Sequence, residues 1–334
     1  MNYYNLIRIN NFTKNPRLKF LGLLFFHVFK KRYISVQFDP INACNLRCKM
    51  CYFSDKNYVK KLKGSFLKEN LPLLSKAILN RAVKLQVGCG TEPTLYKDLN
   101  AVFKTAKKAK VPYVSLTTNA NLIEKDKLEY WVKNGLNEIT VSMHGVHQKT
   151  YEYFMEKGDY KRFLLSLKYI TEIKKSYPNF KLRVNYTFNE DNFKELEDFW
   201  SMFKNIDIDY LQIRPIDNIG NTEYHNFSLK KIEPIYNKIF KKISEGAIKN
   251  NAILLAPKLD RLKNKQSMNS VIQPFIYCYI SPLVFWKQDF NWKNETYNEY
   301  CKRNHWVKQI IKLIFAKKST IISLQNKTLN YDVI

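Results

Sequence analysis

The sequence predicts an α/β fold: a partial (β/α)6 barrel of the TIM type, followed by a smaller, mainly helical or irregular C-terminal extension. Between residues 33 and about 215, six short runs rich in β-branched and aromatic residues alternate with longer segments of helical pattern. This alternation is typical of parallel strands joined by crossover helices. Apolar residues make up 45% of the 334 residues, enough to bury one large core, or one domain and a smaller one.

The expected elements follow one another along the chain. The strands are Tyr33–Phe38, Ala82–Val87, Tyr113–Thr118, Glu138–Met143, Lys181–Thr187 and Tyr210–Ile213. The helices lie near 65–80, 97–109, 124–134, 148–176 and 192–204, with another near 228–249. The chain is thereby divided into a basic N-terminal segment (1–32), the barrel (33–220) and an extension that covers the substrate side (221–334). In such barrels the loops after the strands carry the chemistry.

The loop after the first strand holds three of the six cysteines, Cys44, Cys48 and Cys51, within eight residues. Soft sulfur ligands suit zinc or an iron–sulfur cluster. A structural zinc site needs a fourth cysteine or histidine nearby, whereas His27 and Cys89 are distant in sequence. A cubane cluster held by three cysteines instead leaves one iron open to a small molecule. A disulfide with a spare thiol, or chance clustering, is the alternative. We find no secretion signal, and therefore expect reduced thiols.

Glycines and polar residues follow the next strands. After the second strand, Gly88 and Gly90 free the backbone for close approach to a ligand, and Glu92 offers a carboxylate. The third strand ends in Thr118 and Asn119, which suit the vicinal hydroxyls of a ribose. Three more polar residues belong to the later strands, namely Ser142, Asn185 and Arg214. For these three, ordinary strand-end hydrogen bonding is as good an explanation as a ligand role.

No catalytic residue follows from the sequence, but Cys89 and His144 are candidates at the same strand ends. Cys89 could donate a hydrogen atom to a substrate radical or bind a second cluster; the alternative is a small buried residue. His144 could orient substrate or move a proton, and the alternative is a loop histidine bonded to backbone. His147 is the only other histidine close to His144 in the sequence, so a metal site here would lack a third ligand.

The spacing Cys-x3-Cys-x2-Cys, followed directly by the aromatic Tyr52, resembles the radical S-adenosylmethionine (SAM) superfamily. The run from Gly88 resembles the Gly-Gly-Glu-Pro motif of that family, with Thr91 inserted. Thr118 and Asn119 resemble its Thr-Asn-Gly ribose motif, with alanine at the glycine position. The resemblance covers residues 33 to about 215.

The resemblance implies that Cys44, Cys48 and Cys51 hold a [4Fe–4S] cluster and that SAM chelates the fourth iron. The implied SAM-binding residues are Gly88, Gly90, Glu92, Thr118, Asn119, Ser142, Asn185 and Arg214. An external one-electron donor of the flavodoxin or ferredoxin type would drive reductive cleavage of SAM to a 5′-deoxyadenosyl radical. That radical would abstract hydrogen from a substrate, which the protein positions and shields from water.

The net charge of +27 favours polyanionic partners, although solvated lysine faces explain it equally well. Residues 16–33 and 305–318 are apolar and basic, and their apolar runs are too short to span a membrane. Each either lies in a membrane interface or packs on the domain. We therefore expect a cytoplasmic protein. Peripheral contact with the inner face of an anionic membrane is compatible with this expectation.

Three substrate classes remain. A cell-envelope glycan or lipid-linked precursor accounts for the two basic amphipathic segments and the charge. A peptide-modifying maturase would carry a SPASM-like cysteine-rich extension, but Cys278 and Cys301 hold an auxiliary cluster only with a further ligand such as Cys89. The positive net charge is the only feature that favours nucleic-acid modification. We therefore do not expect nucleic acid as a partner.

Overall fold

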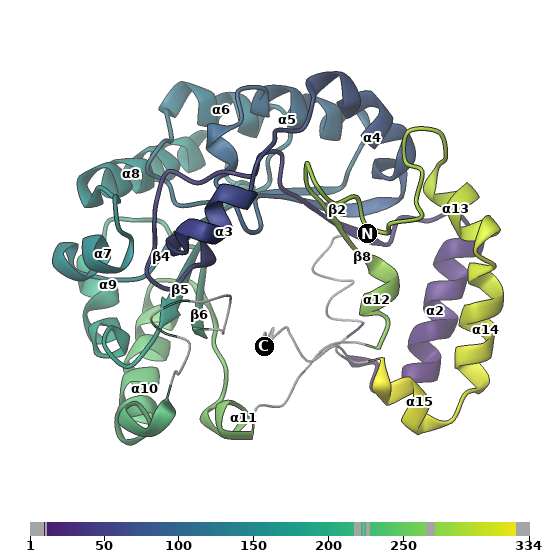
Figure 1. The fold of residues 1–334 in the computed structure, drawn as a ribbon. Coiled ribbons are helices and arrows are strands. Elements are labelled where there is room, and N and C mark those ends of the chain that lie inside the picture. The colour runs from purple at the N-terminus through teal and green to yellow at the C-terminus, as the bar shows by residue number, and fades with distance from the viewer. Residues whose placement is uncertain are drawn as a thin grey trace.

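The computed structural model describes residues 10–324, except 11, 217–221, 223, 225–227 and 265–270. Its centre is one curved sheet with the strand order β7-β6-β5-β4-β3-β2-β1-β8 (Figure 1). All neighbouring strands in it are parallel. The strands are β1 (Ile34–Phe38), β2 (Ala82–Val87), β3 (Tyr113–Thr118), β4 (Glu138–Met143), β5 (Lys181–Phe188), β6 (Tyr210–Pro215), β7 (Ile253–Leu255) and β8 (Tyr277–Ile280).

The predicted fold class and all six predicted strands are confirmed. The bounds of β2, β3 and β4 are those expected, and the other three differ by one or two residues. Two strands of the extension were not expected: β7 pairs with β6, and β8 pairs with β1. They have three and four residues, too few for a clear alternating pattern. The extension therefore completes both edges of the sheet. The predicted boundary at residue 220 lies outside the described residues.

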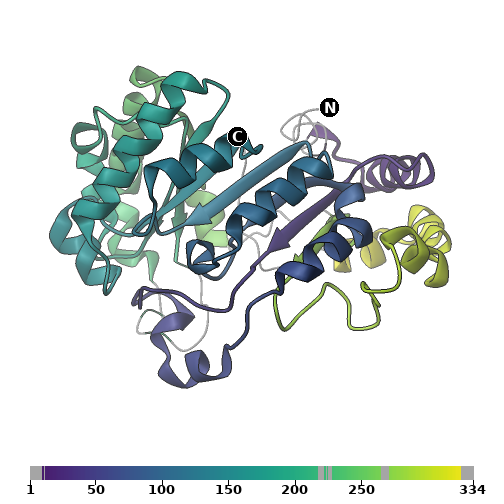
Figure 2. The same cartoon turned by 90° about the horizontal axis from the view of Figure 1, so that it is seen from above.

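Helices cover the convex face of the sheet (Figures 1 and 2). They are α4 (Leu71–Ala77), α5 (Leu99–Lys108), α6 (Lys125–Lys133), α7 (Gln148–Phe154), α8 (Tyr160–Ser176), α9 (Phe199–Met202) and α10 (Glu233–Lys249). In α5, the buried residues Leu99, Val102, Phe103 and Ala106 recur at helical spacing. α8 begins at the N-cap Asp159, whose carboxylate accepts a hydrogen bond from the amide of Arg162.

The two faces of the sheet differ in chemistry because side chains alternate along each strand. Val36, Leu85 and Ile139, all at most 1% exposed, belong to the apolar core. The alternate positions are mostly polar and face the concave side. They include Ser35, Gln37, Lys84, Gln86, Ser115, Thr117, Glu138, Thr140, Ser142, Arg183, Asn185, Gln212 and Arg214. The concave side is thus suited to a ligand rich in hydrogen-bonding groups.

The N-terminal helix α2 (Pro16–Val28) packs on the domain beside α14 (Trp306–Phe315) at the β8 end of the sheet (Figure 1). It begins at the N-cap Asn15, and its inner residues Phe20 and Leu23 are buried. No helix in the described part of the chain is long and apolar enough to cross a membrane. The remaining α-helices of the described residues are α3 (Lys56–Lys61), α11 (Leu259–Asn264), α12 (Gln273–Ile276), α13 (Tyr297–Arg303) and α15 (Lys318–Ser323).

Candidate functional site

The cysteine loop leaves the sheet at the carboxyl end of β1. Cys44, Cys48 and Cys51 are free thiols that are each half-buried. The guanidinium of Arg47 donates to the carbonyls of Cys44 (2.8 Å) and Leu46 (2.7 Å), and the Cys51 amide donates to the Cys48 carbonyl at 2.9 Å. These bonds fix the course of the loop between its cysteines.

The sulfur atoms lie close enough to affect one another's ionisation. Burial, above all, raises the pKa of Cys44 to about 12, and the charges of Glu92 and Cys51 raise it further. Burial also raises the pKa of Cys48 well above its usual value, followed by the charges of Cys51 and Cys44. Without a cation the three thiols therefore stay protonated, and a metal cluster would stabilise their thiolates.

This donor set fits an iron–sulfur cluster better than a single ion. Among the described residues, no three histidine, cysteine, aspartate or glutamate side chains converge closely enough to hold one metal ion. In a [4Fe–4S] cluster, however, each cysteine binds a different iron atom, so three thiols on one loop need not meet at a point.

Glu92 holds together the cysteine loop, the glycine-rich loop (residues 88–95) and the end of β3. Its carboxylate is 1% exposed and accepts hydrogen bonds from the amide of Asn119 (2.8 Å) and the hydroxyl of Thr118 (2.8 Å). It also accepts from the amide (3.1 Å) and hydroxyl (2.6 Å) of Thr94. The amide of Glu92 donates to the Ala43 carbonyl at 2.9 Å. Burial raises the pKa of this carboxyl, and the four hydrogen bonds oppose that effect.

Asn119 reaches from the end of β3 to the cysteine loop. Its side-chain amide donates to Asn45 Oδ1 at 2.8 Å and lies 3.9 Å from the Cys44 sulfur. The next residue, Ala120, has a φ of +63°, a left-handed conformation that explains why glycine suits this position. Two of the predicted motifs are therefore adjacent in space.

Asp39 is a central residue that the sequence did not single out. Its carboxylate is fully buried and accepts from the amides of Cys89 (2.7 Å) and Gly90 (3.1 Å) and the hydroxyl of Thr91 (3.0 Å). The hydroxyl of Tyr279 in β8 donates to it at 2.9 Å. Its place directly after a strand was the one available signal.

The two glycines are required by close contacts. Gly88 has a φ of +81°, and an added Cβ would lie 2.4 Å from the Thr117 carbonyl oxygen. At Gly90 an added Cβ would lie 2.2 Å from the hydroxyl oxygen of Tyr52, which donates to the Gly90 carbonyl. Tyr52 therefore packs on the glycine-rich loop. Met50 is buried beside Phe154.

The later strands place polar groups on the same concave side. Ser142, Asn185 and Gln212 lie in one row across β4, β5 and β6. The buried Oδ1 of Asn185 has no hydrogen-bond partner among the described residues. Arg214 donates to the hydroxyl of Thr187 at 3.1 Å.

His144 is half-buried in this region, and its Nδ1 atom is buried. Burial, and secondly the charge of Arg214, lowers its pKa to about 4. Its Nδ1 has no hydrogen-bond partner in the described part of the chain. The imidazole is therefore neutral at physiological pH. The positive charge of Arg214 also acts on Cys51, where it opposes the rise in pKa that burial causes.

Cys89 and Cys278 lie on opposite faces of the sheet. The Cys89 thiol donates to Gln37 Oε1 on the concave side at 3.3 Å, and the residue is exposed, so it is not the small buried residue of the alternative interpretation. Cys278 alternates with Tyr279 along β8 and is fully buried in the apolar core, as is Cys301 at 1% exposure. The arrangement does not bring Cys89, Cys278 and Cys301 together as ligands of one auxiliary cluster.

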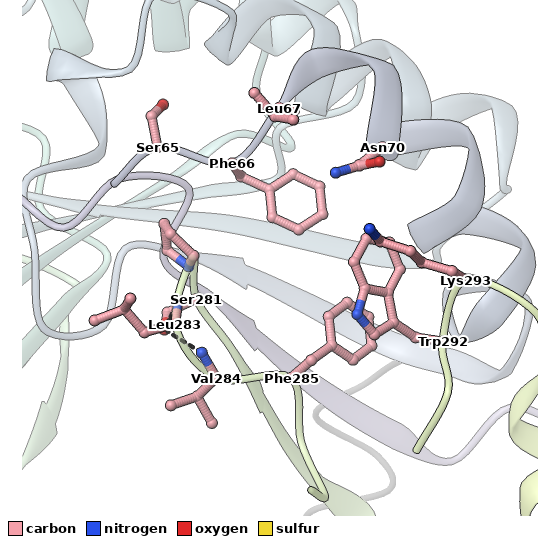
Figure 3. A pocket seen from close by; sticks show the side chains of 11 residues that line it. Ser65, Phe66, Leu67, Asn70, Ser281, Leu283, Val284, Phe285, Trp292 and Lys293 are labelled. Atoms are coloured by element: carbon pink, nitrogen blue, oxygen red, sulfur yellow. Dashed lines mark hydrogen bonds between the residues drawn. The ribbon is translucent and has the colours of Figure 1, made fainter. Parts of the chain in front are cut away.

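A pocket of about 370 Å³ opens between residues 65–70 and the segment after β8 (Figure 3). Phe285 and Trp292 stack in it with centroids 4.3 Å apart. The apolar side chains of Leu67, Leu283 and Val284 form its rim, and they are 63%, 62% and 49% exposed. The amide of Phe66 donates to the carbonyl of Pro40 at 2.8 Å, which ties the pocket to the base of the cysteine loop.

Sequence comparisons find relatives that share the motif region. The profile of the Radical SAM superfamily matches residues 38–199. A probable GTP 3′,8-cyclase of Methanocaldococcus jannaschii is 25% identical over 228 residues, covering 66% of this chain and 71% of that protein. A probable GTP 3′,8-cyclase of Saccharolobus islandicus is 26% identical over 206 residues, covering 59% of this chain and 63% of that protein. The chain thus spans less than two thirds of the Saccharolobus protein.

Solved structures share the fold. SuiB of Streptococcus suis, bound to S-adenosylmethionine, has a TM-score of 0.59 at 15% identity, covering 83% of this chain and 65% of SuiB. The protein anSMEcpe with bound AdoMet has a TM-score of 0.57 at 19% identity, covering 85% of this chain and 84% of that chain. The sequence profile and the order of the motifs along the strands assign residues 38–199 to the radical SAM superfamily, whose enzymes use a [4Fe–4S] cluster and SAM.

Proposed function

We propose that Cys44, Cys48 and Cys51 bind the [4Fe–4S] cluster and that the glycine-rich loop and Asn119 bind SAM beside it. The observation that carries this assignment is the hydrogen bonding of Glu92, which joins the cysteine loop, the glycine-rich loop and the end of β3. Because four donors already occupy the Glu92 carboxylate, its role is to position the site. The amino group of SAM then contacts the loop backbone, which Asp39 and Glu92 hold in place.

A cluster held by Cys44, Cys48 and Cys51, with SAM beside it and an external one-electron donor, would supply the radical chemistry that removes hydrogen from the substrate. The remaining tasks belong to the chain. Asn185 accepts a hydrogen bond from SAM through its unpartnered Oδ1, Ser142 adds a hydroxyl in the same row, and Arg214 offers a positive charge to a carboxylate. His144 stays neutral.

Iron analysis after anaerobic reconstitution tests the cluster assignment. The wild type should contain about four irons per chain, and a variant with Cys44, Cys48 and Cys51 all changed to alanine should contain none. Cys89→Ser is the matched control, and it should keep the full iron content. Iron retained by the triple variant would refute the assignment.

The substrate that we propose is a cell-envelope glycan or lipid-linked precursor. The concave face offers neutral hydrogen-bonding side chains, among them Gln37, Thr117 and Gln212, which suit a polyhydroxyl group. The pocket with the apolar rim opens beside the base of the cysteine loop, where it suits an attached hydrocarbon. One edge of the sheet thus offers complementary surfaces to both parts of such a molecule.

A nucleoside triphosphate is the second candidate, because the sequence relatives include proteins named GTP 3′,8-cyclase. The concave face carries Lys84 and Arg214, side chains of the type that bind phosphate. The formation of 5′-deoxyadenosine distinguishes the candidates, since a true substrate raises it above the rate with SAM alone. Stimulation by lipid-linked sugars and not by GTP supports the first proposal, and the reverse result supports the second.

We also propose that the protein works in the cytoplasm, in peripheral contact with an anionic membrane. The support is the concentration of basic and apolar residues in the two terminal helical regions. A lipid-linked substrate would require such contact. Co-sedimentation of the full chain with vesicles tests this proposal.

A further inference from the structure

We propose that α2 and α14 together form a docking surface for an anionic lipid membrane. This inference deepens the proposed envelope function and rests on it for its purpose, although binding is measurable independently. The helices are antiparallel neighbours. His27 at the end of α2 packs against Trp306 at the start of α14, with ring centroids 4.3 Å apart and ring planes tilted by 32°. Arg17 at the start of α2 donates to the carbonyl of Ala316, just after α14, at 3.5 Å.

The solvent side of α2 is apolar. Apart from Arg17 at its start, its exposed residues are Leu18 (55%), Leu21 (47%), Phe25 (53%) and Val28 (56%). Their spacing of three and four residues places them along one side of the helix. Phe29, the next residue, is 60% exposed. A helix that only packs on a core presents polar residues to solvent, so this stripe indicates a second apolar contact.

α14 carries a second exposed apolar stripe. Val307, Ile311 and Phe315 are 36%, 41% and 81% exposed, and they are spaced at every fourth residue. Trp306, Ile310 and Ile314 are the buried residues that face the domain. Lys308 and Lys312 each follow a residue of the stripe and are also exposed. Apolar contact and positive charge therefore occur along the same helix.

Charge identifies the partner. Neither residues 1–38 nor residues 304–331 contain an aspartate or glutamate. The basic residues in and next to the two helices are Arg17, Lys19, Lys30, Lys31, Arg32, Lys308, Lys312, Lys317 and Lys318. A second copy of this surface would bring like charges together, which opposes association. Anionic headgroups complement the charge, and the acyl boundary complements the apolar stripes.

The geometry suits a helix pair that lies in the membrane interface. α2 has 13 residues and α14 has 10, fewer than the ~20 needed to span a membrane. In the interface, the apolar stripes would insert at the headgroup boundary, while the lysine side chains extend to the phosphates. The contact would leave the sheet and its loops in the aqueous phase.

Co-sedimentation of the reconstituted full chain with vesicles tests the surface. The wild type should bind vesicles of equal parts phosphatidylglycerol and phosphatidylcholine at physiological salt, and not phosphatidylcholine alone. The double variant Leu21→Glu, Phe25→Glu should bind at least about tenfold more weakly, since it loses two apolar groups. Ile248→Glu is the control, because Ile248 is an 80% exposed apolar residue on α10, away from the helix pair.

A charge variant provides a second test that leaves the apolar stripes intact. Lys308→Gln with Lys312→Gln should weaken binding about 25-fold, at about fivefold per charge, whereas Lys238→Gln with Lys249→Gln on α10 should not. The proposal would be overturned if the wild type failed to bind anionic vesicles, or if the two α10 control variants lost as much vesicle binding as the α2 and α14 variants. It would also be overturned if the wild type were a dimer and the Leu21→Glu, Phe25→Glu variant a monomer, because the apolar stripes would then be a protein interface.

SAM cleavage measured on the same samples separates the two levels of the proposal. Vesicle binding lost while 5′-deoxyadenosine formation persists shows that docking and radical chemistry are independent, as expected. Wild type that cleaves SAM but ignores vesicles refutes the docking surface alone. Wild type that binds vesicles but holds no iron refutes the cluster assignment alone.

Discussion

The carboxylate of Glu92 accepts a hydrogen bond from the backbone amide of Asn119 at 2.8 Å, across the gap between two neighbouring strand ends. Asn119 in turn donates to Asn45 in the cysteine loop at 2.8 Å. The hydrogen-bonded series Glu92, Asn119 and Asn45 therefore links three loops at one edge of the sheet. These residues set the distance between the proposed cluster ligands and the proposed SAM site.

Glu92→Gln should weaken SAM binding and leave iron content unchanged. The amide oxygen of glutamine can accept hydrogen bonds, but its NH2 group would face the donors of Thr118, Asn119 or Thr94. A buried donor without an acceptor costs about 1–3 kcal/mol, part of which should appear as a loss of SAM affinity of about tenfold. Calorimetric titration with SAM measures it. The exposed Glu124→Gln is the control; unchanged affinity in both variants would contradict the positioning role.

Gly90→Ala should destabilise the glycine-rich loop, and Tyr52→Phe should partly restore it. The added Cβ would lie 2.2 Å from the Tyr52 hydroxyl oxygen but 3.4 Å from the ring carbon that bears it. Removing the oxygen therefore relieves the clash. We expect a positive coupling energy of about 1–2 kcal/mol in a double-mutant cycle, measured by chemical unfolding.

The same cycle with Gly88→Ala is the matched control. There the added Cβ would meet the carbonyl of Thr117 at 2.4 Å, and the φ of +81° is unfavourable for alanine. Tyr52→Phe should not restore that variant. Equal coupling in both cycles would show that Tyr52 acts on the loop in some other way than by filling the space beside Gly90.

Cys278→Ala and Cys301→Ala should leave the iron content at about four per chain. Both side chains are buried in the apolar core, and Cys278 lies on the face of the sheet opposite Cys89. Each substitution removes buried sulfur and should lower the free energy of unfolding by about 1 kcal/mol. Iron and sulfide analysis of the reconstituted variants checks the prediction. A loss of iron in either variant would show that an auxiliary cluster exists.

Stability should fall as the pH is lowered from about 6.5 to about 4. Burial, and secondly the charge of Arg81, lowers the pKa of His27 from 6.5 to about 4. Above pH 6.5 the imidazole is neutral in both the folded and the unfolded chain. Below it, the unfolded chain takes up a proton that the folded chain does not, so the free energy of unfolding decreases until the folded pKa is reached.

His27→Gln isolates this contribution. The wild type should lose stability relative to the variant as the pH falls between those two values, as measured by urea unfolding at successive pH values. His144, with its pKa also near 4, contributes equally to both proteins and cancels in the difference. A stability difference that does not change with pH would contradict the prediction.

Local patterns predicted the elements because each strand and its following loop are continuous in sequence. Cys44, Glu92 and Asn119 could be placed together for that reason, since parallel strands end at one edge of the sheet. Asp39 escaped notice because its partners are distant in sequence: Cys89 is 50 residues away and Tyr279 is 240 residues away. The contact of Tyr33 with Tyr297, which anchors the helical region near α2, spans 264 residues. Periodicity carries no information on such pairings.

Because β8 pairs with β1, the chain cannot be cut near residue 220, where its sequence pattern changes, without opening the sheet. A fragment ending near residue 220 would lack both β7 and β8, so β1 and β6 would become open edges with unpaired backbone groups. Such edges recruit strands from other molecules. A shortened enzyme that kept every recognisable motif would therefore be expected to aggregate, and transplanting the motif region alone would not transfer its activity.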